Sequence, residues 1–179
     1  MRIGFDLDKI FINSPPFIPD ALITRLYMKK PDGALEYRIP SKPEQGLRRL
    51  SHLPVFRPPI PENLAFLKSI PKDKNKIYLI SSRFKFLEGQ TNDLVKKYRL
   101  DKIFEEMYFN FENRQPHIFK NKVLKKLNLD LYIDDDLSLL NYVAKENKKT
   151  KFFWLNHTKK NHRLADNIFA ISKLSDIFK

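Results

Sequence analysis

The chain has 179 residues, a length that fits one domain, or one domain with a small insertion, and excludes three or more. Apolar residues make up 42% of it, including 15 Phe and 7 Tyr, which is enough for a substantial core and too much for a disordered chain. The 34 Lys and Arg outnumber the 21 Asp and Glu, so the formal net charge is +13. This surplus favours anionic partners such as phosphorylated small molecules, nucleic acid or an acidic membrane surface, although a Lys-rich solvated surface would give the same count.

Several kinds of site are excluded by what the sequence lacks. The chain has no Cys, so disulfides and thiolate metal sites are excluded, and its four scattered His leave little for a zinc site. No stretch approaches the roughly 18 uncharged apolar residues of a membrane span. Charges at Arg2, Asp6 and Asp8 interrupt any secretory signal. We therefore expect a cytoplasmic protein that has no membrane partner.

The first predicted element is a strand over residues 2–8, RIGFDLD, and a Pro-rich segment follows it. Eleven of the 12 Pro lie between Pro15 and Pro71, which indicates a separately built insertion. Inside this segment, 20–30 and 62–70 have helical spacing, and we expect the part between them to be mostly extended or irregular. We therefore predict a core domain that covers 1–15 and 71–179, and an insertion that covers 16–70.

Beyond the Pro-rich segment, short apolar runs alternate with segments of helical composition. The predicted buried strands are KIYLISS (76–82), EMYFNF (106–111), DLYIDD (130–135), KFFWLN (151–156) and NIFAIS (167–172). The predicted helices are 88–99, 117–128 and 137–147. This alternation predicts a three-layer, Rossmann-like α/β fold, an open parallel sheet with right-handed crossovers and helices on both faces. The ligand crevice of such a sheet lies at the carboxyl ends of its strands.

Asp6 and Asp8 end the first predicted strand. Residues two apart on a strand share a face, so both carboxylates can point into one crevice. Two neighbouring carboxylates repel each other unless a cation or a shared proton relieves them. Mg²⁺ takes hard oxygen ligands, typically one or two carboxylates, and leaves positions for water and a substrate phosphate. The alternative is a strand-end pair that only helps a turn.

Three further features lie where the predicted strands and helices meet. Ser81 or Ser82 follows KIYLI, where a hydroxyl and nearby backbone N–H groups could hold a phosphate oxygen. Lys120 opens the helix before the fourth strand, where an ammonium could offset carboxylate and phosphate charge. Three acidic residues, 134–136, follow LYI, and Asp136 could simply cap the helix that begins near 137. Each feature is ordinary by itself.

Taken in order, these features resemble the motifs of the haloacid dehalogenase (HAD) superfamily of phosphohydrolases. IGFDLD is similar to the first motif, LISSR to the second, Lys120 to the third and YIDDD to the fourth. The resemblance extends over about 1–14 and 76–172, and the Pro-rich insertion lies where that superfamily places its first type of cap. KIYLISSR and KNKVLKKLNLDLYIDDD resemble the nucleotidase-type branch most. The order and spacing of the motifs carry the resemblance more than any one of them.

The first motif departs from the family pattern D-x-D-G-T. Lys9 and Ile10 stand where the family has Gly and Thr. Without this Gly, the turn after the aspartates is expected to be less flexible. Lys9 could contact a phosphate or be a solvated Lys. For the second motif, the pattern apolar, apolar, Thr or Ser, x, Arg aligns Ser81, with Ser82 and Arg83 beside it as further substrate-binding candidates.

The resemblance implies a Mg²⁺-dependent phosphomonoesterase. Asp6 would attack phosphorus and form an aspartyl phosphate, and Asp8 would protonate the leaving oxygen and then activate the hydrolytic water. Mg²⁺ would be held by Asp6, by the backbone carbonyl of Asp8 and by Asp134.

The other motif residues would support this chemistry. Ser81 would orient a phosphoryl oxygen, Lys120 would stabilise its charge, and Asp135 would anchor Lys120 or a metal-bound water. The expected substrate is a phosphorylated small molecule, with nucleotides among the candidates.

The alternatives are a nucleic-acid-binding protein on the same scaffold and a phosphatase that acts on nucleic-acid ends. They depend on basic and aromatic residues interleaved in the insertion, which could equally form cap surface and cap core. These are Arg25, Tyr27, Lys29, Lys30, Tyr37, Arg38, Arg48, Arg49, Phe56 and Arg57. His117, His157 and His162 are further candidate chemical groups, or ordinary histidines.

Overall fold

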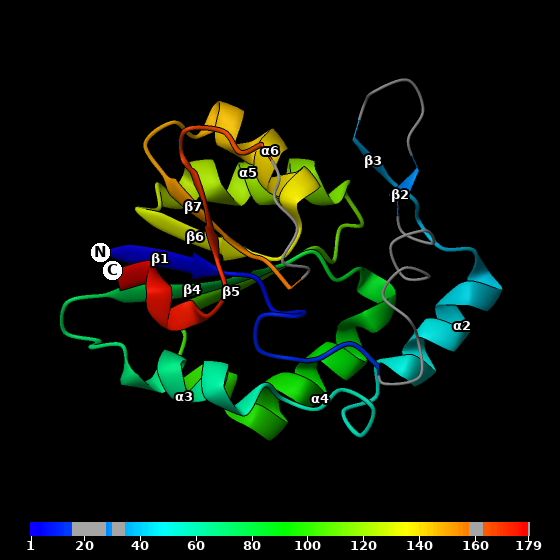
Figure 1. Cartoon of the computed structure of the whole chain (residues 1–179). Coiled ribbons are helices and arrows are strands. Elements are labelled where there is room, and N and C mark those ends of the chain that lie inside the picture. The colour runs from blue at the N-terminus through cyan, green and yellow to red at the C-terminus, as the bar shows by residue number, and fades with distance from the viewer. Residues whose placement is uncertain (16–27, 30–34, 158–162, 179) are drawn as a thin grey trace.

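A computed structural model describes residues 1–15, 28–29, 35–157 and 163–178. In this part of the chain, six parallel strands form one sheet in the order β5-β4-β1-β6-β7-β8 (Figure 1). Their bounds are Arg2–Phe5 for β1, Lys76–Ser81 for β4, Glu106–Phe109 for β5, Leu131–Asp134 for β6, Lys151–Leu155 for β7 and Ile168–Ile171 for β8. The predicted α/β fold with a parallel, Rossmann-like sheet is confirmed.

The strand order reverses beside the first strand. The chain builds outward from β1 through β4 to β5 on one side, then returns to pair β6 with β1 and continues to β8 on the other. In an open α/β sheet, a ligand crevice forms at the carboxyl ends of the strands where the order reverses. The ends of β1, β4 and β6, which carry the first, second and fourth motifs, are therefore neighbours.

The helices cover both faces of the sheet. α4 (Glu88–Tyr98) lies with α3 (Pro61–Ser69) against one face, while α5 (Pro116–Leu127) and α6 (Leu137–Glu146) lie against the other (Figure 1). The short 3-10 helices are η1 (Lys85–Leu87), η2 (Leu100–Lys102) and η3 (Leu174–Phe178). The three helices predicted in the second part of the chain are confirmed. None of the helices in the described ranges combines the length and apolar composition needed to cross a membrane.

Each face has its own apolar cluster. On β4, Ile77 and Leu79 pack with α3 and α4, whereas Tyr78 and Ile80 pack with α5 and α6. This alternation follows from the two-residue period of a strand. The outermost strands are less covered, because β5 is only partly buried and Phe169 of β8 is 42% exposed, so the prediction of buried strands is wrong at these edges.

Gly4 permits close packing at the centre of the sheet. A Cβ atom at this position would lie 2.4 Å from a side-chain carbon of Leu129 and 2.9 Å from one of Tyr132. Any side chain would push these residues away from β1. Gly4 therefore lets β6 and its preceding loop stay tight against the strand that leads into the first motif.

The Pro-rich segment contains more regular structure than predicted. α2 (Lys42–Ser51) forms where an irregular stretch was expected, because Pro43 lies in its first turn, where a proline costs no hydrogen bond. β2 (Met28–Lys29) pairs antiparallel with β3 (Glu36–Tyr37), so the helix predicted over 20–30 does not include residues 28–29. The rest of that predicted helix lies outside the described residues. The helix predicted over 62–70 is confirmed as α3.

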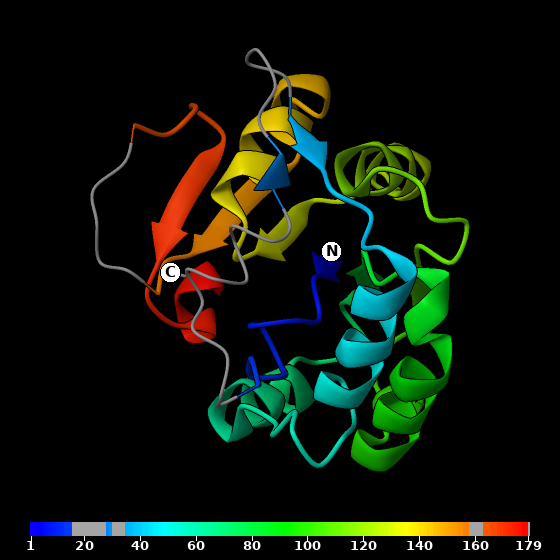
Figure 2. The same cartoon turned by 90° about the vertical axis from the view of Figure 1, so that its right-hand side faces the viewer.

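The two halves of this segment lie in different places. Figure 2 shows α2 beside α4, and the β2-β3 hairpin nearer to α6. α3 instead packs under the sheet, where Leu67 and Ile70 join the same apolar cluster as β1 and β4. Of the described parts of the segment, α2 and the β2-β3 hairpin therefore lie toward the carboxyl ends of the strands.

Candidate active site

Three carboxylates meet at the carboxyl ends of β1 and β6. Asp6 follows β1, Asp134 ends β6 and Asp135 follows it, and one oxygen of each lies within 4.8 Å of the others. The ammonium of Lys120, from α5, donates to Asp6 Oδ1 at 2.7 Å and to Asp134 Oδ2 at 2.6 Å. Residues from the first, third and fourth motifs thus come together, although more than a hundred positions separate Asp6 from Lys120.

The local structure holds this cluster rigidly. Asp134 Oδ2 accepts a hydrogen bond from the Tyr132 hydroxyl at 2.9 Å, and Oδ1 accepts one from the backbone N–H of Asp136 at 3.0 Å. Asp136 caps α6 by accepting from the N–H of Leu139, which confirms the predicted capping role. Lys120 is only 3% exposed. Removal of this ammonium would leave both carboxylates buried without their shared counter-charge.

Burial and mutual repulsion shift the protonation of this cluster. Burial raises the pKa of Asp6 to about 7, with Asp134 and Asp8 adding to the rise and Lys120 opposing it. Burial also raises the pKa of Asp135 well above its usual range. Burial acts to lower the pKa of Lys120, but the carboxylates of Asp134 and Asp6 outweigh it and raise that pKa well above 10.5.

These residues fit a magnesium ion. Mg²⁺ prefers hard oxygen donors and is typically held by one or two carboxylates together with water and phosphate. Asp6, Asp134 and Asp135 offer such oxygens within reach of one another. A divalent cation would relieve the repulsion from Asp134 that adds to the effect of burial on the pKa of Asp6. The carboxylate of Asp8 is not a member of this cluster, so its predicted part in metal binding rests on its backbone carbonyl.

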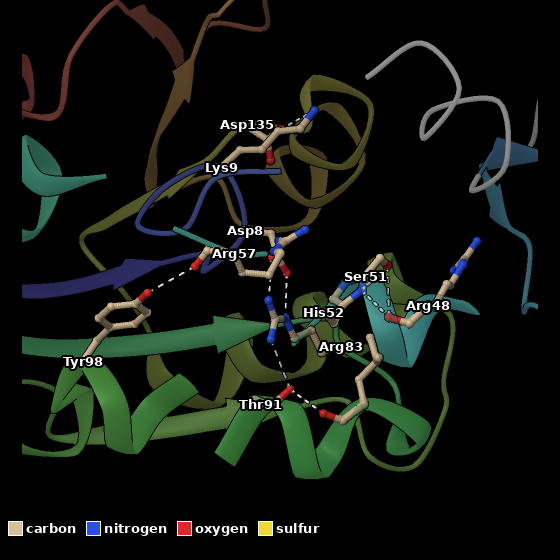
Figure 3. Close-up of polar contacts among 11 residues, drawn as sticks. Asp8, Lys9, Arg48, Ser51, His52, Arg57, Arg83, Thr91, Tyr98 and Asp135 are labelled. Carbon is tan, nitrogen blue, oxygen red and sulfur yellow. Dashed lines mark hydrogen bonds and ion pairs between the residues drawn. The ribbon is translucent and has the colours of Figure 1, made fainter. Parts of the chain in front are cut away.

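The carboxylate of Asp8 has different partners. Arg83 donates to Asp8 through Nε at 2.9 Å and through Nη2 at 2.8 Å, and the guanidinium of Arg57 also donates to Oδ1 (Figure 3). Both arginines are 4% exposed. Burial alone would raise the pKa of Asp8, but the two guanidinium groups outweigh it and hold that pKa well below its usual range.

Arg57 reaches Asp8 because its segment is bound to the loop after β1. The N–H of Asn13 donates to Pro58 O at 2.9 Å, and the N–H of Ile60 donates to Phe11 O at 2.8 Å. The Tyr98 hydroxyl donates to the carbonyl of Arg57 at 3.2 Å. The Pro-rich segment therefore contributes a charged residue directly to the candidate site.

The second motif lies at the end of β4. Ser81 is buried, and β4 pairs with β1 so that Leu79 is level with Phe5. The hydroxyl of Ser82 is also buried, and it has no hydrogen-bond partner among the described residues. Ser81 and Ser82 thus lie beside the first motif, as predicted, whereas Arg83 contacts Asp8.

Lys9 adopts a backbone conformation that a glycine would adopt more easily. Its φ is 59°, in the left-handed region that residues with a Cβ rarely adopt. Its ammonium lies 3.7 Å from Asp135 Oδ2, and its carbonyl lies 3.2 Å from His157 Nε2. The expectation that Asp135 anchors Lys120 is wrong, because the partners of Lys120 are Asp6 and Asp134. The alternative, that Asp135 anchors a metal-bound water, stays a prediction.

Sequence reasoning did not assign Tyr37 or His52 to the site. Tyr37 anchors the β2-β3 hairpin, because its hydroxyl donates to Asp136 at 2.5 Å and its backbone exchanges two hydrogen bonds with the Gln115 side chain. His52 is buried near Arg83 and Arg57, and burial together with these cations lowers its pKa to about 3. No local pattern marks either residue, since their partners are distant in the sequence.

Several basic and aromatic residues of the insertion are interior residues. Tyr37, Arg48 and Arg57 are each less than a tenth exposed, so they cannot form the exposed nucleic-acid surface. His117 is buried between the rings of Tyr37 and Tyr142, which identifies it as a packing residue. Residues 25, 27, 30 and 162, also named as candidates, lie outside the described part of the chain.

Comparison with solved structures identifies the fold. A putative β-phosphoglucomutase from Thermotoga maritima superposes with a TM-score of 0.61 at 18% identity, over 98% of this chain and 95% of the other. D,D-heptose 1.7-bisphosphate phosphatase from B. bronchiseptica, solved with magnesium and phosphate, gives 0.57 at 10% identity over 99% and 96%. A HAD-superfamily hydrolase from Ehrlichia chaffeensis gives 0.53 at 13% identity over 98% and 93%.

The chain therefore has the fold of HAD-superfamily hydrolases. No family model matches the sequence, and no curated protein matches it. The likeness is in the fold, and the chemistry has to be argued from the site.

Proposed function

We propose that the protein is a Mg²⁺-dependent phosphomonoesterase that acts through an aspartyl phosphate on Asp6. The observation that carries this proposal is the buried cluster in which Lys120 contacts both Asp6 and Asp134, with Asp135 beside them. A buried carboxylate cluster with a fixed ammonium at a strand-order reversal is suited to binding a cation and a phosphate together. The fold likeness to HAD-superfamily hydrolases supports the same reading.

In this proposal Asp6 is the nucleophile. One of its oxygens attacks phosphorus, the bond from phosphorus to the leaving oxygen breaks, and that oxygen takes up a proton. Water then attacks the phosphoryl group on Asp6, releases inorganic phosphate and restores the carboxylate. Asp6, Asp134, Asp135 and the carbonyl of Asp8 would hold Mg²⁺, which supplies charge stabilisation for the phosphoryl oxygens. Lys120 neutralises charge on Asp6 and on the phosphoryl group, and Ser81 orients a phosphoryl oxygen.

Asp8 is the proposed acid and base. Two guanidinium groups hold its carboxylate in the ionised form that a base needs, and the same groups lower its affinity for the proton of the attacking water. To give a proton to a leaving oxygen, it must first take one up, and at least one arginine must then release it. The site is therefore better suited to the base step than to the acid step. Phosphate esters whose leaving groups need little protonation should be its easiest substrates.

We further propose that the part of the segment 16–70 that precedes α3 is a cap, since α3 packs under the sheet. The proposed substrate is a phosphorylated small molecule, such as a nucleotide, in the cytoplasm. Arg57 and Tyr37 support the cap, because both reach from the segment to residues beside the acidic cluster. The nucleotidase-type branch rests on the motifs alone. Of the residues on which the nucleic-acid alternatives depend, Tyr37, Arg48 and Arg57 are interior. Arg49 and Phe56 are exposed, so a nucleic-acid substrate stays an alternative prediction.

A phosphatase screen tests this proposal. Purified protein is assayed with nucleotides, sugar phosphates, phosphorylated oligonucleotides and an aryl phosphate, with Mg²⁺ or with a chelator. We expect phosphate release that requires Mg²⁺ and is lost in the Asp134→Asn variant. Lys96→Met, which removes one charge from an exposed position near the end of α4, serves as the matched control. Phosphate release that survives both chelation and Asp134→Asn would refute the proposal.

A further inference from the structure

Lys9 places a second ammonium beside the acidic cluster. The loop that carries it is firmly held, because the N–H of Lys9 donates to Ile12 O at 2.7 Å and residues 10–12 are fully buried. The side chains of Lys9 and Asp135 are 25% and 20% exposed, so their ion pair is only partly open to water. Figure 3 shows the ammonium of Lys9 directed at Asp135. The held backbone and this ion pair therefore place the ammonium of Lys9 beside the acidic cluster.

The charges of the cluster change when Lys9 is counted. Asp6, Asp134 and Asp135 bring three carboxylates, and Lys120 neutralises one of them. Lys9 offsets a second, so a single negative charge is left for a divalent cation to balance. A glycine at position 9 would leave two. The chain therefore carries part of the positive charge that the site would otherwise draw from its metal ion.

We propose that Lys9 is a built-in counter-cation of the acidic cluster, which competes with the divalent cation for Asp135 and attracts the phosphate. This inference rests on the metal site of the proposed function. An ammonium within a few ångströms of a divalent cation repels it, and the same ammonium attracts a phosphate dianion. Lys9 should therefore weaken metal binding and strengthen phosphate binding. One residue is then expected to act on the two ligands in opposite directions.

The test measures both affinities on the full chain. Mn²⁺ binding to the metal-free protein is followed by electron paramagnetic resonance, and inorganic phosphate binding is followed by calorimetry at saturating Mn²⁺. We expect Lys9→Met to bind Mn²⁺ on the order of tenfold more tightly and phosphate on the order of tenfold more weakly. Lys96→Met should change neither. A variant that was merely misfolded would lose affinity for both ligands.

A second variant protects the test against folding failure. Lys9→Gly suits the left-handed backbone at this position, and it should give the same two shifts as Lys9→Met. Mn²⁺ affinity that is unchanged or weaker in both variants, while the unaltered protein binds Mn²⁺, would overturn the role of Lys9 and leave the proposed function standing. An unaltered protein that binds no Mn²⁺ would overturn both.

Discussion

The two aspartates that follow β1 are separated by a single residue, yet their carboxylates lie in different surroundings. Asp6 faces an acidic cluster with one shared ammonium, and its pKa is raised to about 7. Asp8 faces two guanidinium groups, and its pKa is held well below its usual range. Asp6 gains its partners from α5 and β6, whereas Asp8 gains one from the end of β4 and one from the insertion.

The difference shows how one strand end can supply two chemical roles. Two carboxyl groups whose surroundings push their pKa values apart are suited to different steps of a reaction. The acidic cluster around Asp6 favours a bound cation, which would keep the Asp6 carboxylate ionised and able to attack phosphorus. Asp8 already has its cations, which keep its carboxylate ionised, so a guanidinium group has to move away from it as it takes up a proton. Four substitutions test the contacts and roles of these two aspartates and of their neighbours.

The largest effect is expected from Asp6→Asn. The amide keeps the shape of the side chain but is no nucleophile and brings no charge to the metal site. Turnover of every substrate should fall by about 10⁴-fold or more, as found when a nucleophile is removed. Phosphate release measures this, with circular dichroism as the control for folding. A variant that kept even a tenth of the turnover would refute the role of Asp6.

Asp8→Asn should depend on the substrate. Removal of a general acid and base typically costs about 10²–10⁴-fold in rate. The loss should be smallest for aryl phosphates and largest for alkyl phosphates, whose leaving oxygen needs a proton. The rate of the first step, measured in single turnovers with a series of leaving groups on both proteins, gives the comparison, because the second step is the same for every substrate. Equal losses across the series would show that Asp8 does not donate the proton.

Lys120→Met should mainly reduce stability. The methionine fills the space but leaves Asp6 and Asp134 buried without their ammonium, and breaking a buried ion pair in this way costs about 3–5 kcal/mol. Urea unfolding measures the change in the free energy of unfolding. Bound Mn²⁺ should recover part of the loss, since it also neutralises these carboxylates. A loss below about 1 kcal/mol would mean that the ammonium is not paired as described.

Tyr37→Phe should have the smallest effect of the four. The ring keeps its packing on His117, and the backbone keeps its hydrogen bonds to Gln115, so only the hydroxyl contact with Asp136 is lost. A hydrogen bond to a charged group contributes about 1.5–3 kcal/mol. The same urea titration should show a loss in the lower part of that range. An unchanged free energy of unfolding would mean that the hydrogen bond from Tyr37 to Asp136 does not hold the β2-β3 hairpin in place.

Sequence reasoning reached those parts of the site that local pattern encodes. Apolar runs that end in Asp6, Ser81 and Asp134 mark strand ends, and parallel strands bring their ends together whatever lies between. The contact of Arg57 with Asp8 was not predicted. Arg57 lies in the Pro-rich segment and reaches Asp8 only because residues 57–60 pack on the loop after β1. The helix α2 was not predicted either, since Pro43 is read as a helix breaker unless it is known to lie in the first turn.

The most direct test of the account is the detection of a phosphoryl group on Asp6. The protein is mixed with an aryl phosphate and Mg²⁺, quenched in acid within the first turnover, digested and examined by mass spectrometry. We predict a phosphoryl group on the peptide that contains Asp6, more of it in Asp8→Asn because the second step then lacks its base, and none in Asp6→Asn. Steady turnover without any phosphorylated peptide, or with the phosphoryl group on another residue, would contradict the account.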